Sequence, residues 1–284
     1  MSGQPTGDKP RRFPLSLDRV GTPAARPAGP AREMLRPQAP LAQAELDRRR
    51  TTAPQGLGMD SRAVQRRMVE RLRADGIRHP RVLEAFGTVP RHWFVDSALV
   101  NQAYEDTSLP IGLGQTISKP SVIGSMIELL CTRPSALPDA PHPLGNCLDI
   151  GTGCGYQAAL LSCMARRVVS IERLRDLHLK ARVNLDRLRQ GWPQWQDVRL
   201  VYADGMLGHP PNAPYDTIIA AAGGTSVPPA WLEQLAPGGR LVAPLQGHQP
   251  GQQVLTVIDR LPNGQLQHAT AGQVLFVPLK SGTT

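Results

Sequence analysis

Cysteine is scarce in this sequence, and its arrangement argues against both a disulfide framework and a metal site. Cys131, Cys147, Cys154 and Cys163 form no CxxC pair, and no histidine lies beside them at a metal-ligand spacing. We therefore expect free thiols in a reducing cytoplasm and no bound metal. Cys154 lies inside a glycine-rich loop, but the sequence places no companion histidine near it that would make it a nucleophile.

Long apolar runs are also missing. No run approaches the roughly 20 residues that a membrane-spanning helix needs, and the N-terminus lacks the apolar segment of a secretory signal. We therefore expect a cytoplasmic protein with no membrane association. Aromatic residues make up only 4% of the chain, but 40% of its 284 residues are hydrophobic, which is enough for one large α/β domain or two small ones.

Positive charge is concentrated at the N-terminus. The formal net charge is +9, and residues 1–58 hold ten Lys or Arg against five Asp or Glu. The same segment has nine prolines and one aromatic residue, Phe13, so it buries too little apolar surface to offset the entropy lost on ordering. We expect a disordered basic extension over 1–58 and a single domain over 59–284. The extension is either a weak tether to anionic surfaces or a dispensable segment upstream of a start at Met59.

A helical cap and a long loop are expected over residues 59–130. Val64, Met68 and Leu72 recur every four residues, which predicts a helix that begins near Asp60 or Ser61. A second short helix is predicted over residues 81–86, and the aromatic residues at 93 and 94 are expected in the core of the cap.

Residues 104–120 contain two glycines, two prolines and several hydroxyl groups, which predicts a long ordered loop. Long loops in compact domains are usually functional. A helix with a broad apolar face is predicted from Pro120 onward. Ser118 stands beside the start of that helix, where it is either a plain N-cap or a group that holds a carboxylate together with main-chain amides.

A glycine-rich turn between a strand and a helix dominates the second half of the chain. An apolar strand ends in Asp149, and Gly151, Gly153 and Gly155 follow before a helical pattern begins. These glycines permit a tight turn and the close approach of a ligand. The pattern is typical of the first unit of a nucleotide-binding α/β sheet, which we expect over residues 146–284.

Acidic residues around this turn indicate which nucleotide it binds. Glu172 closes the next strand 21 residues after Gly151, where a carboxylate can bind the two hydroxyls of a ribose. Asp149 suits a ligand amine and would repel a pyrophosphate, so S-adenosylmethionine fits better than NAD. Asp204, at the end of a third strand, can accept from an adenine amine. The alternative is that Asp149 and Glu172 only cap or salt-bridge strand ends.

The later strands predict a doubly wound, mostly parallel sheet with helices on both faces. Parallel strands are predicted over residues 198–202, 215–222 and 240–243. Two further strands, 253–259 and 273–277, have a turn at 262–264 but no helix between them, which predicts an antiparallel pair at the sheet edge. This finish favours a methyltransferase over a dehydrogenase.

With these residues in view, the sequence resembles the protein-L-isoaspartate O-methyltransferases, with a Rossmann-like class I methyltransferase fold, over about residues 62–279. Its most specific part is LPIGLGQTIS at residues 109–118, supported by LDIGTGCGYQ at 148–157, LAPGGRLV at 235–242 and FVPL at 276–279. Lys119 and Leu275 depart from the family pattern, which commonly has Gln and Arg there. Lys119 adds a cation near an anionic substrate.

The resemblance implies transfer of a methyl group from S-adenosyl-L-methionine to the free α-carboxylate of L-isoaspartyl residues in damaged proteins and peptides. The ester then closes to a succinimide, and hydrolysis returns some normal aspartate. Ser118 is the predicted catalytic residue, and the substrate-binding residues are Gln115, Thr116, Ile117 and Ser118. The predicted cofactor-binding residues are Asp149, Gly151, Thr152, Gly153, Gly155, Tyr156, Gln157, Glu172, Asp204 and Gly205.

Two other functions stay open from the sequence. One is a class I methyltransferase with another acceptor, although no Asn-Pro-Pro-Tyr-type motif for amine methylation is present. The other is a binding protein that keeps the cofactor site and recruits partners through its basic extension. We expect a monomer with no nucleic-acid partner beyond weak contact by the extension.

Overall fold

A computed structural model describes residues 61–137, 140–192, 197–247, 249 and 251–284. The predicted disordered extension, residues 1–58, lies outside these residues. No described helix is long and apolar enough to cross a membrane.

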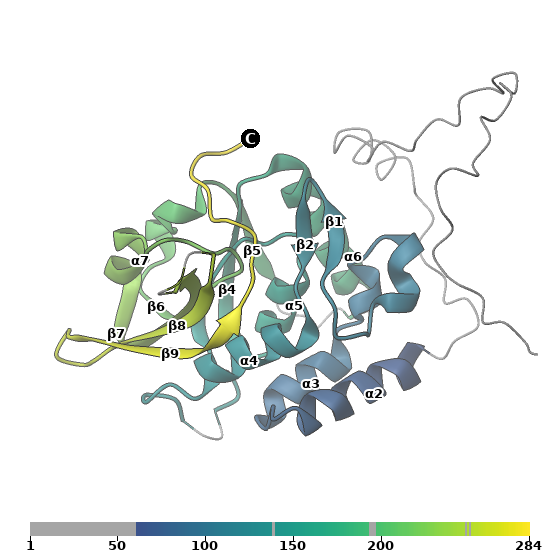
Figure 1. The fold of residues 1–284 in the computed structure, drawn as a ribbon, viewed down its shortest axis with the longest axis horizontal. Helices are drawn as coiled ribbons and strands as arrows, with labels where there is room; N and C mark the ends of the chain where they lie inside the picture. The colour runs from purple at the N-terminus through teal and green to yellow at the C-terminus, as the bar shows by residue number, and fades with distance from the viewer. Residues whose placement is uncertain (1–60, 138–139, 193–196, 248, 250) are drawn as a thin grey trace, which may run out of the picture. The chain divides into compact units, whose positions relative to one another are not determined.

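A seven-stranded sheet with the order β5-β4-β3-β6-β7-β8-β9 organises the described chain (Figure 1). Strands β3 to β7 are parallel to one another, and β8 and β9 are antiparallel. The strands are β3 Gly145–Ile150, β4 Ala165–Glu172, β5 Val198–Tyr202, β6 Tyr215–Ala220, β7 Leu235–Gln246, β8 Gln253–Arg260 and β9 Leu266–Val274. The predicted mixed, doubly wound sheet is confirmed, although β6 ends two residues before its predicted end.

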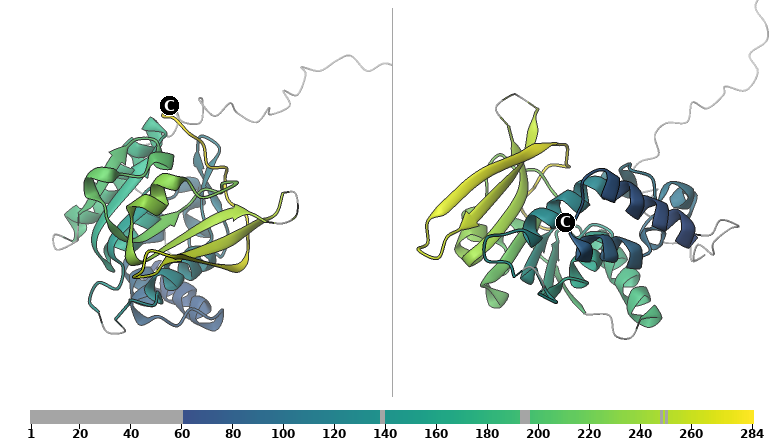
Figure 2. Two further views of the ribbon diagram at one scale, coloured as in Figure 1. Left: turned by 90° about the vertical axis from the view of Figure 1, so that its left-hand side faces the viewer. Right: turned by 90° about the horizontal axis from the view of Figure 1, so that it is seen from below.

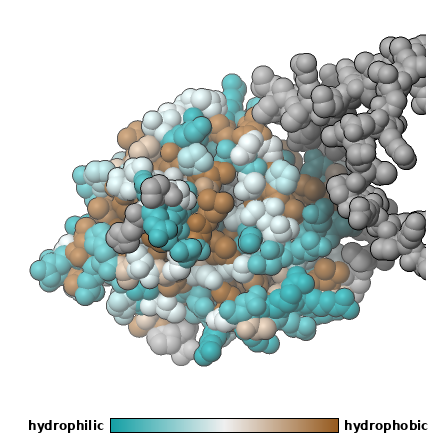
Figure 3. All heavy atoms as spheres, viewed as in Figure 1, coloured by the Kyte–Doolittle hydropathy of each residue, from teal (hydrophilic) through white to brown (hydrophobic). Residues whose placement is uncertain are grey.

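Alternating residues along the strands face two separate cores. In β3, Cys147 packs into one core, while Leu148 and Ile150 pack into the other. Both faces of the sheet are therefore covered, as a parallel sheet requires. The helices are α2 Ser61–Ala74, α3 Pro80–Thr88, α4 Pro120–Cys131, α5 Tyr156–Ser162, α6 Arg175–Gly191 and α7 Pro229–Gln234. On the face shown in Figure 3, hydrophobic residues gather toward the middle and hydrophilic residues lie around them.

The helical cap is confirmed. Met68, Leu72 and Phe94 are buried, and α2 and α3 lie side by side (Figure 2). Trp93 is only half-buried, against Trp192 and under the guanidinium of an arginine from α6. Helix α3 begins one residue earlier than predicted, at Pro80, whose fixed φ and missing N–H suit a first helical position, and it ends two residues later, at Thr88.

The predicted antiparallel pair at the C-terminal edge of the sheet is confirmed, but the predicted bounds of its second strand, 273–277, are wrong. The partner of β8 is β9, which follows the predicted turn and ends at Val274. No residue of β9 is buried, so this edge strand lacks the apolar alternation that would reveal it. The apolar residues that follow leave the edge instead, and Pro278 bridges to Gly223 beyond the end of β6.

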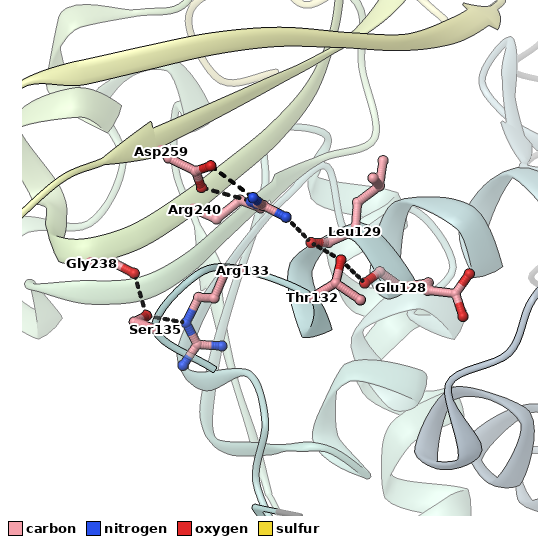
Figure 4. A network of polar contacts seen from close by, with 8 residues as sticks. All are labelled: Glu128, Leu129, Thr132, Arg133, Ser135, Gly238, Arg240 and Asp259. Carbon is pink, nitrogen blue, oxygen red and sulfur yellow. Dashed lines mark hydrogen bonds and ion pairs between the residues drawn. The ribbon is translucent and has the colours of Figure 1, made fainter. Parts of the chain in front are cut away.

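An ion pair ties the antiparallel edge to the rest of the molecule (Figure 4). Arg240 of β7 donates from Nε and Nη2 to the two carboxylate oxygens of Asp259 in β8, at 2.7 Å each. Its Nη1 donates to the Leu129 carbonyl near the end of α4, at 2.8 Å. Such a forked geometry fixes the edge strands relative to α4.

The predicted long loop over 104–120 is wrong in its middle, where the chain forms a hairpin of β1 Leu109–Gly112 and β2 Gln115–Ile117. Leu113 and Gly114 between them both have positive φ, +54° and +70°, as a tight type I′ hairpin turn requires. The strands are too short for a sequence pattern to distinguish them from a loop.

Candidate active site

A cavity of about 420 Å³ opens where β3 and β4 end. It is bounded by the β1–β2 hairpin on one side and by residues 277–280 on another. Of the predicted site residues, the cavity is lined by Gln115, Thr116, Ile117, Ser118, Gly151, Thr152, Gly153, Tyr156, Gln157, Glu172 and Gly205. The predicted donor and acceptor residues therefore meet in one hollow, but Asp149, Gly155 and Asp204 do not line it.

The glycine turn forms the floor of this cavity. Gly151 and Gly153 have φ of +89° and +56°, which strains any residue with a Cβ. A Cβ at Gly153 would also lie 3.1 Å from Cδ1 of Ile111 in the hairpin. A Cβ at Gly155, whose φ is +93°, would instead contact Ala181 and Leu185 of α6, so this glycine permits close packing of that helix.

Glu172 lies at the edge of the turn with 4% of its surface exposed. Its Oε2 accepts from the Gly153 amide at 2.8 Å and its Oε1 accepts from the Leu174 amide at 2.9 Å. Burial raises the pKa of Glu172, and the amides of Leu174 and Gly153 oppose that rise. Each carboxylate oxygen retains acceptor capacity for a hydroxyl, so the ribose role stays a prediction that this geometry permits.

Asp149 lies behind the cavity wall, which corrects the predicted direct contact with a ligand. It is fully buried, and its two oxygens accept from Gln157 Nε2 and Ser170 Oγ at 2.7 Å each. Gln157 lines the cavity and connects it to Asp149 through this hydrogen bond. The Asp149 carboxylate orients the Gln157 amide and places a carboxyl group directly behind the residues that line the cavity.

Asp204 is also used by the protein itself. Its Oδ1 caps the short helix Gly205–Leu207 by accepting from the Met206 amide at 2.9 Å, and its Oδ2 accepts from the Gly282 amide at 2.7 Å. The C-terminal residue is fixed beside it, because Thr284 exchanges main-chain hydrogen bonds with the loop 173–175. A contact with adenine has to use the remaining lone pairs of Asp204 and stays a prediction.

Ser118 is not an N-cap, which removes one of the two sequence alternatives. The residue that caps α4 is Lys119, and it makes no side-chain capping bond. Ser118 is half-buried and lines the cavity. In the part of the chain that the structure describes, no hydrogen bond engages its hydroxyl, which is therefore free to bind a ligand.

A sequence profile described as protein-L-isoaspartate(D-aspartate) O-methyltransferase matches residues 63–284. The chain belongs to this family. It is 57% identical over 278 residues to a protein-L-isoaspartate O-methyltransferase of Methylibium petroleiphilum, a match that covers 98% of each chain. It is 51% identical to the protein of that name from Leptothrix cholodnii, over 96% of this chain and 95% of the other.

Solved structures agree with the family assignment. A protein-L-isoaspartate O-methyltransferase superposes with a TM-score of 0.65 at 26% identity, covering 76% of this chain and 66% of that one. The Plasmodium falciparum enzyme of the same description, crystallised with S-adenosyl-L-homocysteine, has a TM-score of 0.63 at 22% identity and covers 76% and 98%. The latter likeness supports the fold.

One wall of the cavity in this isoaspartate methyltransferase was not predicted from the sequence. Val277, Pro278, Leu279 and Lys280 line the cavity from the C-terminal segment. The FVPL motif at 276–279 marked this segment as typical of the family, but not where it lies. Cys154 in the glycine turn also lines the cavity, and burial raises the pKa of its thiol, which argues against a thiolate nucleophile there.

The buried Asp149 predicts a pH dependence of stability. Burial raises its pKa from 3.8 to about 6, against the opposing hydrogen bonds from Gln157 and Ser170. The folded protein thus binds this proton more tightly than the unfolded chain, so the group stabilises the fold at low pH. Its contribution is lost as the pH rises from about 4 to about 6.

Urea unfolding of wild type and Asp149→Asn at pH 4, 5, 6 and 7 measures this effect. The asparagine keeps both hydrogen-bond partners, because Ser170 Oγ can accept as well as donate. We expect the unfolding free energy of wild type minus that of the variant to fall by about 2 kcal/mol across the series. A constant difference would show that Asp149 has the same pKa in both states.

Proposed function

We propose that this protein methylates the free α-carboxylate of L-isoaspartyl residues in damaged proteins and peptides, with S-adenosylmethionine as the donor. The observation that carries the proposal is that a free serine hydroxyl and a glycine turn with an acidic partner line the same cavity. Family membership supports the same activity. The ester that forms would close to a succinimide without further help from the protein.

The residues that line the cavity fit the donor. Glu172 offers acceptor capacity to a ribose, and the side chain of Gln157 stands where a polar amino acid end can meet it. The Plasmodium falciparum relative was crystallised with the demethylated form of this donor.

The reaction needs alignment more than acid–base chemistry. S-adenosylmethionine supplies a methyl carbon that is already electrophilic because it is attached to a positive sulfur. The acceptor carboxylate is ionised at neutral pH, so no general base is needed. We assign Ser118 to donate its hydroxyl hydrogen to the oxygen that does not react, while Ile117 and Ile123 in the same wall exclude water.

Methyl transfer to a peptide that contains one L-isoaspartyl residue, compared with the same peptide containing normal aspartate, tests the function. We expect transfer to the isoaspartyl peptide alone. Its α-carboxylate is free at that residue, whereas in the normal peptide the α-carboxyl group is in the peptide bond and the side-chain carboxylate is free. Equal transfer to both peptides would indicate another acceptor class. No transfer to either peptide, with normal donor binding, would favour an adaptor role.

We also propose that the protein is a monomer and that it acts in the cytoplasm. We expect no nucleic-acid binding beyond weak contact by residues 1–58. The free state of all four cysteines supports a reducing compartment. Light scattering after gel filtration reports the oligomeric state. Nucleic-acid binding that disappears on deletion of 1–58 would instead support recruitment through the extension.

A further inference from the structure

The hairpin that carries Ser118 has little structure of its own to keep it in place. Its two strands have four and three residues, and only Leu109, Ile111 and Ile117 among them are buried. A two-stranded hairpin is marginal without packing against other elements. Two main-chain carbonyls of this segment, at Ile111 and Ser118, each accept a hydrogen bond from a cationic side chain of a different element.

Arg91 is the first of these cations. It lies in the short helix Arg91–Trp93 and is 0% exposed. Its Nη2 donates to the Ser118 carbonyl at 2.8 Å and to the Thr107 carbonyl at 3.4 Å, so it joins the two ends of the segment. Its guanidinium carbon lies 4.9 Å from the ring centre of Tyr156, which lines the cavity.

This guanidinium is costly where it lies. Its Nε and Nη1 have no hydrogen-bond partner, and it forms no ion pair among the residues that the structure describes. Burying a charge without a counter-ion is unfavourable, and an apolar side chain of similar size would fill the space at lower cost. What an apolar replacement cannot supply is the pair of hydrogen bonds to the carbonyls of Thr107 and Ser118.

Lys180 is the second cation. It is half-buried on α6, and its Nζ donates to the Ile111 carbonyl at 3.0 Å. Helix α6 begins just after Glu172 and Leu174, which belong to the donor side of the cavity. A charge-assisted bond from this helix therefore ties the hairpin to the donor site.

We propose that Arg91 and Lys180 are positioning residues that hold the Ser118 hairpin over the donor cavity by its main-chain carbonyls. Neither side chain lines the cavity, so both act through the residues they contact, which are the hairpin carbonyls for both and also the Tyr156 ring for Arg91. The kinetic consequence rests on the proposed function, since it concerns placement of Ser118 against the acceptor. A displacement of about 1 Å at such a position can cost about 100-fold in rate.

Lys180→Met gives the cleaner test, because Lys180 is half-buried and the variant is expected to fold. The matched control is Arg182→Met, which removes the same charge from an exposed position on the same helix. Lys180→Arg restores a cationic donor. Four quantities are measured for each: amide hydrogen exchange over residues 109–118, the Kd for S-adenosylhomocysteine, and kcat and KM for the isoaspartyl peptide.

For Lys180→Met we expect hairpin exchange to rise about tenfold and kcat to fall about fivefold, with the donor Kd within about twofold of wild type. Lys180→Arg should recover most of both changes, and Arg182→Met should match wild type. Unchanged exchange in Lys180→Met, or an equal effect in Arg182→Met, would overturn the proposal for Lys180.

Arg91→Lys tests the other contact while it keeps the buried charge. Both bonds of Arg91 come from Nη2, and the lysine side chain is one bond shorter, so its Nζ falls short of that position and cannot hold the carbonyls of Thr107 and Ser118 together. We expect faster hairpin exchange and a lower kcat with an unchanged donor Kd; wild-type values in all three would remove Arg91 from the proposal. If wild type does not methylate the isoaspartyl peptide, the proposed function fails, but hydrogen exchange still decides whether these cations hold the hairpin.

Discussion

Replacing Ser118 with alanine is expected to lower kcat for the isoaspartyl peptide by about 10- to 100-fold, while the Kd for S-adenosylhomocysteine changes by less than about twofold. The hydroxyl is not used for capping and lines the cavity. Its loss removes one hydrogen bond to a charged oxygen, worth about 1.5–3 kcal/mol. Main-chain amides of the hairpin remain in place, so binding should suffer less than turnover.

Steady-state kinetics and calorimetry on the same preparations measure the two quantities separately. Ser125→Ala is a matched control, because that hydroxyl only returns to the Ser121 carbonyl within α4 and lies outside the cavity wall. A large loss of donor affinity in Ser118→Ala would show that Ser118 serves the donor and not the acceptor. A kcat equal to that of wild type would show that Ser118 does not align the acceptor carboxylate and that the main-chain amides of the hairpin do so without it.

Strands β3, β4 and β6, most of whose side chains are buried, could be predicted from the apolar residues that they contain. Helices cover both faces of the sheet, so β3 and β6 are buried over almost their whole length, and each contains a short apolar run such as that at 218–220 in β6. By contrast, β9 has no buried residue, and its pairing with β8 depends on main-chain groups that all residues share. The β1–β2 hairpin was not predicted for a different reason. Its strands have only three or four residues, which are too few for the alternation of buried and exposed side chains to be recognised.

Site residues could be predicted where their role depends on local chain geometry. The glycine turn and Glu172 lie at the carboxyl ends of two neighbouring parallel strands, β3 and β4, which places them together. The burial of Asp149 behind the cavity wall could not be predicted from the sequence, because it depends on how the Gln157 side chain is oriented. Distant contacts were also missed: Arg91 lies 27 residues before Ser118, and no pattern links an arginine to a main-chain carbonyl that far away.

Glu172→Ala is expected to weaken binding of S-adenosylhomocysteine by about 1–3 kcal/mol, which is about 5- to 150-fold in Kd. Two effects contribute. A ribose hydroxyl loses its acceptor, and the amides of Gly153 and Leu174 lose the carboxylate that orders the turn. Calorimetry measures the affinity, and urea unfolding of the free protein measures how much of the loss comes from the turn.

Glu172→Gln separates these contributions, because its amide oxygen can still accept from one of the two backbone amides while the charge is gone. We expect an affinity between those of wild type and Glu172→Ala. Exposed Glu105, which lies outside the cavity wall, is the control, and Glu105→Ala should bind the ligand as wild type does. If Glu172→Ala kept the wild-type Kd while its stability fell, the carboxylate would be a turn-stabilising group only. The ribose would then have to be held by residues that no strand-end argument identifies.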